Sequence, residues 1–244
     1  MFPQSTLMSA ITLLLLSALQ VANAARSGGP SHLALKTYDI PLGACTAFAL
    51  HAGSAATFDG NKTIITTGSL GVSPGNFASG NFQLLDGSIE IDSTRANDCA
   101  HDRITAYNAL AAASCPTNQT KTELSGLTLT PGVYCSGKQL TLSATTLTLD
   151  ARGNSDAQWI FQAGSSLITS PFTSVILTNG AQAKNVYWKV GSSATIGYSS
   201  NFVGTIIAYA SITFDHDSTL IGRALCGAAI SSASASTIEL TSSS

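Results

Sequence analysis

The chain has 244 residues, a formal net charge of −2 and only 10% charged residues. It carries no basic stripe, so nucleic acid is not an expected partner, and after its first 24 residues no apolar run is long enough to span a membrane. With so few charges, the surface must consist largely of Ser, Thr, Asn, Gly and Ala, which is unusual because soluble proteins normally display many charged side chains.

The N-terminus reads as a secretory signal peptide over residues 1–24. Ile11 to Leu19 is a short apolar stretch, and Ala22-Asn23-Ala24 supplies the small residues of a cleavage site. Residues 25–36 are interpreted as a flexible leader, residues 37–240 as one domain and residues 241–244 as a Ser-rich tail. The mature protein is therefore expected to be secreted and extracellular.

Five cysteines in an exported chain predict one or two disulfides, with at least one cysteine free or bonded to another chain. The favoured pair is Cys115 with Cys135, because the segment between them must leave a helix and rejoin the strands. The cysteine spacing indicates no metal site, and no cofactor is expected. Asn61 and Asn118 begin sequons and are candidate glycosylation sites if the secretory route is eukaryotic.

One helix is expected over residues 93–113, after a region of strands and turns. Ser93 or Thr94 can cap its N-terminus, and Cys115-Pro116 ends it. A lone helix beside strands is expected to lie along one face and to bury its apolar side there. The apolar residues that recur at three- and four-residue spacing are Ala96, Ala100, Ile104, Tyr107 and Ala111.

A short strand recurs through the second half of the chain. The second residues of five four-residue stretches lie at positions 139, 166, 193, 211 and 229, which gives steps of 27, 27, 18 and 18 residues. A near-constant step with one strand each is the mark of a β-solenoid. In every stretch the third residue is apolar and the second and fourth are mostly small or hydroxylated, so the two sets face opposite sides. Ser54–Thr57 fits the same pattern.

Other β-rich runs lie between these strands and predict two or three strands per coil. Val175–Leu177 is continuously apolar, as expected for a strand covered on both sides, and is therefore assigned to the face beneath the helix. Trp159 and Trp188 lie in apolar strands, which favours packing in the core or against the helix over a role as exposed sugar platforms.

Two enzyme interpretations are weak. Gly71 to Gly75 has the G-x-S-x-G pattern of a nucleophile turn, but Pro74 follows Ser73 and has no N–H for an oxyanion hole. Asp215-His216-Asp217 is the densest polar cluster, and a turn explains it more simply. The carboxylates do not repeat from coil to coil as a paired glycosidase site would require. No catalytic residue is assigned.

The order of these elements resembles the microbial ice-binding (antifreeze) proteins, which are β-solenoids with a flanking helix. The resemblance spans roughly residues 40–240. Its matching stretches are 48–54, 68–75, 127–135, 159–162, 179–181, 185–195, 204–208 and 221–225.

The resemblance implies a right-handed parallel β-helix of triangular section with one long α-helix along one face. It also implies that the N-terminal segment and the C-terminal coils are neighbours, and that one face binds ice. The implied function is non-enzymatic: adsorption to an ice crystal surface that inhibits ice growth and recrystallisation. A monomer is expected.

The outward residues of the recurring strand form the candidate ice-binding site. Short, stiff side chains on such a grid are expected to order a layer of water that merges with the ice lattice. The candidates are Ala55, Thr57, Gln139, Thr141, Ser166, Ile168, Ser193, Thr195, Ser211, Thr213, Ala229 and Ser231.

Two alternatives remain open on sequence grounds. One is an extracellular β-helix that binds or cleaves polysaccharide, and the other is an adhesive module on a cell surface. An ordinary solvent-exposed sheet rich in Ser and Thr would show the same strand pattern, because strands favour Thr anyway.

Overall fold

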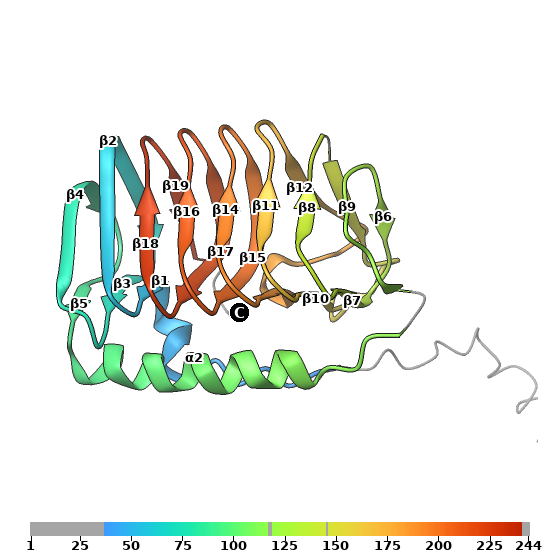
Figure 1. Ribbon diagram of the computed structural model, residues 1–244, viewed down its shortest axis with the longest axis horizontal. Helices are drawn as coiled ribbons and strands as arrows, with labels where there is room; N and C mark the ends of the chain where they lie inside the picture. Colours follow the sequence, from blue (N-terminus) through green and yellow to red (C-terminus); the bar gives the residue numbers. More distant parts are fainter. Residues whose placement is uncertain (1–36, 117–118, 145, 241–244) are drawn as a thin grey trace, which may run out of the picture. The chain divides into compact units, whose positions relative to one another are not determined.

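The computed structural model describes residues 37–116, 119–144 and 146–240. Its strands are joined in parallel into coils, and each full coil contributes to three walls (Figure 1). Within these ranges one α-helix, α2 (Thr94–Ala112), lies along one of the walls, and the 3₁₀ helices η1 (Gly43–Ala47) and η3 (Ala183–Asn185) flank wall strands. The predicted β-solenoid with a flanking helix is confirmed. The proposed signal peptide, leader and tail, together with Asn118, lie outside the described residues.

Wall A contains the recurring strand predicted from the sequence. Its strands follow one another in space in parallel register. They are the first half of β4 (Phe77–Leu84), the first half of β2 (Ala55–Thr67), β18 (Ala229–Ser232), β16 (Ile212–Phe214), β14 (Ala194–Ile196), β11 (Leu167–Thr169) and β8 (Leu140–Leu142).

Wall B follows wall A in each coil and leaves one side open to solvent. It is built from the second halves of β4 and β2 and six further strands in parallel register. These are β19 (Thr237–Glu239), the first half of β17 (Thr219–Cys226), the first half of β15 (Asn201–Ala208), β12 (Ser174–Thr178), β9 (Thr146–Asp150) and β6 (Thr128–Leu129).

Wall C lies beneath the helix. It includes the second halves of β17 and β15, again in parallel register with their neighbours. The remaining strands are β5 (Ile89–Ile91), β3 (Ser69–Val72), β1 (Phe48–Ala52), β13 (Val186–Val190), β10 (Trp159–Ala163) and β7 (Gly132–Ser136).

The strand placed beneath the helix from the sequence is in the wrong wall. Val175–Leu177 belongs to β12 in wall B, where Ile176 is 42% exposed. The strands that α2 covers present Ile160, Tyr187 and Leu225 to it instead, and all three are buried. An apolar run shows that a strand has two apolar sides, but only the packing decides which side another element covers.

The helix begins and ends close to its predicted bounds, but a different stripe of it is buried. The Ser93 hydroxyl caps the N-terminus by accepting a hydrogen bond from the Ala96 N–H. The buried residues are Ala96, Cys99, Ala106 and Leu110, whereas Ile104 is 50% exposed. A disulfide from Cys99 to Cys45 in η1 is consistent with this rotation, because it turns the Cys99 side of the helix towards the coils.

The helix carries the chain from one end of the stack to the other (Figure 1). Strands β1 to β5 form the end coils, and α2 then returns along wall C to the start of β6 and β7. Its 19 residues cover about 28 Å at 1.5 Å each, close to the depth of six coils stacked about 4.8 Å apart. Cys115 is bonded to Cys135 in β7, the pair favoured from the sequence, and so ties the end of this crossing to the first coil.

The first strands of the domain pair with strands of the last coils. Strand β1 pairs with both β3 and β17, and β2 pairs with both β18 and β19. The neighbourhood of the chain's N-terminal segment and its C-terminal coils, implied by the resemblance, is thus confirmed.

The interior of the coils holds stacked aromatic side chains. The rings of Phe161 and Trp188 stack with centroids 4.0 Å apart. The indole N–H groups of Trp159 and Trp188 donate to the carbonyls of Leu129 and Val203, so neither buried indole is left without a partner. Both tryptophans are core residues and not sugar platforms.

Candidate functional site

The outward surface of wall A carries two straight ranks of small side chains. All twelve residues singled out from the sequence lie in these ranks. Rank 1 is Phe77, Ala55, Ala229, Ser211, Ser193, Ser166 and Gln139, and rank 2 is Ser79, Thr57, Ser231, Thr213, Thr195, Ile168 and Thr141.

Phe77 and Ser79 extend the wall by a strand that sequence reasoning missed. Phe77-Ala78-Ser79 in β4 pairs with Ala55-Ala56-Thr57 in β2. The signal was present, because Ala78 alternates with two outward residues as in the other strands. Phe77 is 53% exposed at the end of rank 1.

The inward residues between the ranks are buried in every strand of wall A except β4, where Ala78 is partly exposed. Ile230, Ile212 and Ala194 have no exposed surface, and the same holds for Leu167. Neighbouring strands in a sheet lie about 4.8 Å apart, and outward residues along one strand repeat about every 6.6 Å. The ranks therefore form a two-dimensional grid that is anchored from below by a close-packed core.

Side chains within the ranks hold one another in place. The hydroxyls of Thr213 and Ser231 lie 3.1 Å apart, within hydrogen-bonding distance. The backbone N–H groups of Ser211 and Ala229 donate to the hydroxyls of Ser193 and Ser211 in the preceding coils. Such bonds restrict the rotation of hydroxyls that already have few rotamers.

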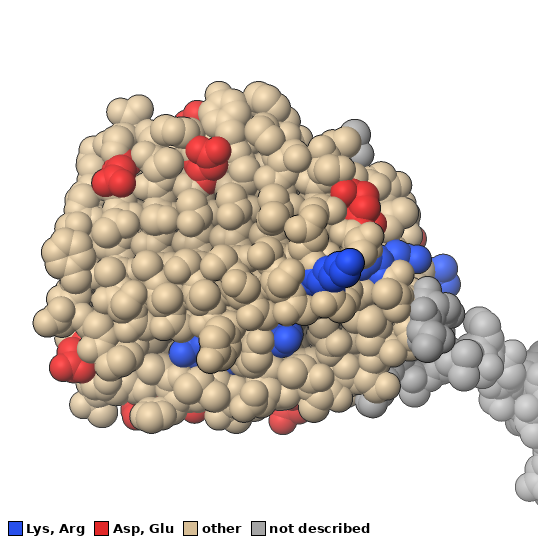
Figure 2. Space-filling view, in the orientation of Figure 1, with Lys and Arg blue, Asp and Glu red and all other residues tan. Residues whose placement is uncertain are grey.

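No charged side chain lies in either rank. Figure 2, which looks onto this side, shows an unbroken tan field over β18, β16, β14 and β11. Charged residues lie at the edges of this field: Asp215 and Asp217 occupy the turn after β16, and at the far end Lys138 precedes Gln139 and Glu123 bridges to Thr141. Partial burial alone would raise the pKa of Glu123, but hydrogen bonds from Ser125, Ser143 and Thr141 outweigh it and hold that pKa at about 2.

A column of glycines forms the corner between walls C and A. A Cβ on Gly53, Gly164, Gly191 or Gly227 would lie between 2.1 and 2.4 Å from a carbonyl oxygen of the next coil. A side chain at these four positions would therefore collide with the next coil, which favours glycine there. Sequence reasoning did not use this column, although glycines precede the recurring strand at positions 137, 164, 191 and 227.

The weaker candidates from the sequence lie apart from one another. Ser73 is buried where wall C turns into wall A, and its hydroxyl donates to the Asn97 side chain on the helix. Asp215–Asp217 forms the turn where wall A leads into wall B, with Asp217 at a φ of 55°. Ser73 and His216 therefore sit at different corners and form no nucleophile–base pair. Asn61 is exposed in β2.

The described residues contain neither a membrane-spanning helix nor a metal site. None of their helices is long and apolar enough to cross a membrane. No group of three or more His, Cys, Asp or Glu side chains in those ranges is arranged to hold a metal ion.

Comparison with known proteins identifies the family. A model of the ice-binding-like family matches residues 50–238. The chain is 41% identical over 187 residues to an ice-binding protein of Nostoc sp. (strain HG1), covering 75% of this chain and 68% of that protein. It spans only 14% to 50% of the length of four other curated relatives.

Solved structures agree with this assignment. An ice-binding protein from an Antarctic biological consortium superposes with a TM-score of 0.79 at 38% identity, covering 88% of this chain and 96% of that one. One from the Antarctic ascomycete Antarctomyces psychrotrophicus also gives a TM-score of 0.79, at 32% identity and with 85% and 100% coverage. The fold and the sequence match together define an ice-binding β-solenoid, and the chain belongs to the ice-binding-like family.

Proposed function

We propose that this protein binds ice through the two ranks of wall A and thereby inhibits ice growth and recrystallisation. The observation that best supports this proposal is the uncharged, in-register grid of small side chains over seven parallel strands. Family membership supports the activity, and the geometry of wall A supports the choice of surface.

The physical argument rests on water held at fixed spacing. A Thr hydroxyl anchors a water molecule, while its methyl favours a cage of water around it. Because χ1 of Thr is restricted, little side-chain entropy is lost on adsorption. Lys or Glu at these positions would hold strong, differently oriented hydration shells. Adsorbed molecules would pin the ice front, curve it and lower the local freezing point.

Wall B is a less suitable ice-binding surface. It carries the charged residues Asp150 and Glu239, whereas the ranks of wall A carry no charged residue. Wall C is covered by α2. Wall A is thus the one of the three walls that is open, regular and free of charge in its ranks.

The proposal also states where the protein acts and in what form. It acts outside the cell after residues 1–24 are removed, as a monomer and without catalysis. Ice forms outside cells first, so an exported protein meets its ligand where the ligand grows. Polysaccharide cleavage is not supported, because Asp150 in β9 and Glu239 in β19, the carboxylates of wall B, are separated by three strands, about 19 Å at 4.8 Å per strand step, and a glycosidase pair lies within about 10 Å.

Thermal hysteresis and ice recrystallisation measured on residues 25–244 test this function directly. We expect a freezing point depressed below the melting point, faceted crystals and slow recrystallisation. Thr195→Tyr and Thr213→Tyr should each remove most of the hysteresis, because a large ring lifts the grid off the ice.

Thr237→Tyr in wall B is the matched control. Thr237 has partial exposure similar to that of Thr213 and lies in an adjoining coil, so this variant should keep the hysteresis of the parent. If both wall A variants keep full activity with unchanged melting curves, wall A is not the working face. If unmodified protein leaves crystals as plain discs, the ice-binding proposal fails altogether.

A further inference from the structure

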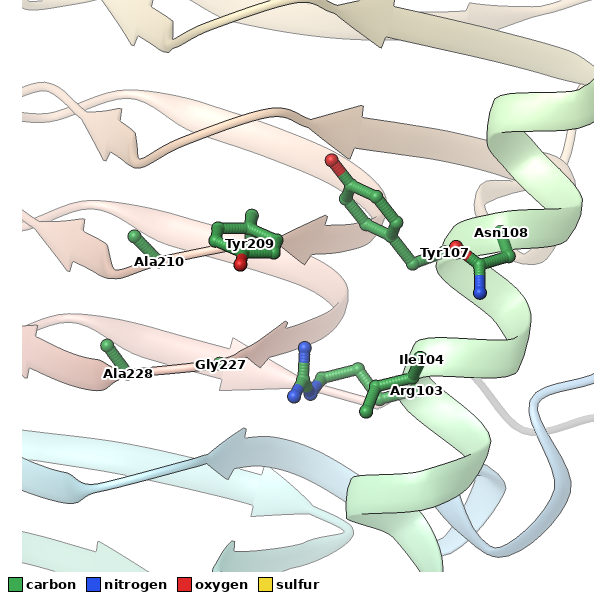
Figure 3. A pocket seen from close by; sticks show the side chains of 8 residues that line it. All are labelled: Arg103, Ile104, Tyr107, Asn108, Tyr209, Ala210, Gly227 and Ala228. Carbon is green, nitrogen blue, oxygen red and sulfur yellow. The ribbon is translucent and has the colours of Figure 1, made fainter.

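A pocket lies between α2 and the corner that joins wall C to wall A. Its volume is about 540 Å³, within the range of small-ligand sites. Arg103, Tyr107 and Asn108 line it from the helix, and Tyr209 lines it from the coil (Figure 3). The other lining residues are apolar or glycine, so the pocket combines apolar walls with a few polar groups.

Tyr209 occupies a position that is glycine in neighbouring coils. Its backbone N–H donates to the Val190 carbonyl, which aligns it with Gly191 on one side, and Gly227 follows it on the other. The side chain is 69% exposed. Its ring centroid lies 6.3 Å from that of Tyr107, so two tyrosines from different elements flank the pocket. A bulky exposed ring in a column of glycines is not explained by packing of the coils.

Arg103 brings an unbalanced positive charge to the same pocket. Its Nε is buried without a hydrogen-bond acceptor, and within the described ranges it forms no ion pair. The acidic group that interacts with it is the Cys226 thiol. Burial raises the pKa of this thiol to about 11, so it is neutral at pH 7 and supplies no counter-charge.

A second cation lies close by. The Nζ of Lys189 is 4.8 Å from the centre of the Tyr107 ring. Figure 2 shows basic atoms in the strip between the uncharged wall A and the helix. The pocket therefore has a positive side and an aromatic side.

We infer that this pocket binds a uronic-acid residue of an acidic polysaccharide. A guanidinium recognises a carboxylate by paired charge-assisted hydrogen bonds. Tyrosine rings offer apolar faces to the C–H face of a pyranose, with hydroxyls at their edges. The Asn108 amide can both donate to and accept from sugar hydroxyls. This inference is independent of ice binding.

Calorimetric titration with an oligogalacturonate, at room temperature and without ice, tests the inference. We expect binding that weakens with added salt, and at least about tenfold weaker binding of a neutral maltooligosaccharide of equal length. Tyr209→Ala should weaken galacturonate binding by about tenfold or more. Tyr198→Ala, which removes an exposed tyrosine at another corner, should leave binding unchanged.

Arg103→Gln separates recognition of charge from stacking. It should abolish the preference for the acidic over the neutral sugar, and Tyr209→Ala keeps the test decisive if Arg103→Gln fails to fold. The inference is overturned if galacturonate does not bind, if both sugars bind equally, or if Tyr209→Ala leaves the affinity unchanged. Displacement of galacturonate by inorganic phosphate or oligoglutamate at equal concentration also overturns it, because the pocket would then select anions and not sugars.

Discussion

Thr195 and Thr213 illustrate what a single residue contributes to wall A. Each lies in rank 2, directly between buried core residues of its own strand, and each keeps its hydroxyl and methyl at the surface. Ile168, 40% exposed in the same rank, keeps the branched shape without the hydroxyl. Shape and stiffness therefore persist along the rank even where hydrogen bonding does not.

His51 shows the cost of a buried polar residue at the same scale. Its Nε2 pairs with the Ala96 carbonyl on the helix, while Nδ1 has no partner. Burial lowers the pKa of this imidazole, the nearby Arg103 lowers it further, and the bond to Ala96 only partly opposes both. The folded protein therefore holds His51 neutral.

This predicts that the stability of the protein depends on pH below about pH 6.5. Because the pKa is lowered on folding, the unfolded chain binds the proton first, and stability is lost as the pH falls below about 6.5. The free energy of unfolding should fall by at most about 1.4 kcal/mol per pH unit from this group. Urea denaturation across this range measures it.

His51→Gln is the variant that isolates the effect, since it cannot take up a proton. It should be less stable at pH 7 and should lose the pH-dependent fall in stability that begins at about pH 6.5. Glu123, whose pKa of about 2 lies below the ordinary value of about 4.5 for a Glu carboxyl, affects stability only below about pH 4.5 and does not interfere. An unchanged slope in His51→Gln would contradict the assignment.

At the scale of the element, α2 depends on covalent and packing anchors more than on its own amphipathicity. The helix buries four residues, three of which are Ala or Cys. The buried side of the helix is interrupted by Arg103, which is half-buried. Disulfides hold the first half of the helix to η1 and the segment after it to β7.

Removing the Cys45–Cys99 disulfide should therefore destabilise the protein. The bond closes a separation of 54 residues, for which the loss of chain entropy in the unfolded state gives about 2–4 kcal/mol. Cys45→Ala with Cys99→Ala should lower the free energy of unfolding by that amount. Denaturant unfolding, followed by circular dichroism, measures it.

Wall A should survive this change. Its register depends on strand pairing and not on the helix, so the same double variant should keep its hysteresis at low temperature. A loss of hysteresis in a variant that is still folded would show that the helix shapes the ice-binding surface.

At the scale of the whole described solenoid, the chain does not wind from one end to the other. The first strands pair with the last, so the coil order in space differs from the order in sequence. In a simple solenoid each repeat contacts only its sequence neighbours. Here the strands β1 and β2, near the start of the chain, need pairing partners from β17, β18 and β19, near its end.

Ending the chain after Gly227 tests this arrangement. The deletion removes β18 and β19, which flank β2. Amide hydrogens of residues 55–84 should then exchange quickly, while those of β10, β13 and β14 should stay protected. Hydrogen exchange read by mass spectrometry distinguishes the two regions. Full protection of residues 55–84 in the shortened chain would contradict the role of the last coil.

The sequence by itself determined the features that depend on local periodicity. Alternation along Ser192–Thr195 and Ala210–Thr213 predicted both outward ranks, because strand side chains change sides at every residue. Ser93 and the three- to four-residue spacing predicted one helix of nearly the observed length. The pair Cys115–Cys135 followed from where the helix must end.

Only the tertiary structure decided which surfaces meet. Val175–Leu177 and the strands of wall C are both apolar, and no local pattern tells which one receives α2. Local patterns also do not tell which side of the helix is buried, that β1 pairs with β17, or that Arg103 and Tyr209 line one pocket. The reason is physical: alternation is set between neighbouring residues, whereas burial depends on contacts between segments that lie far apart in the chain.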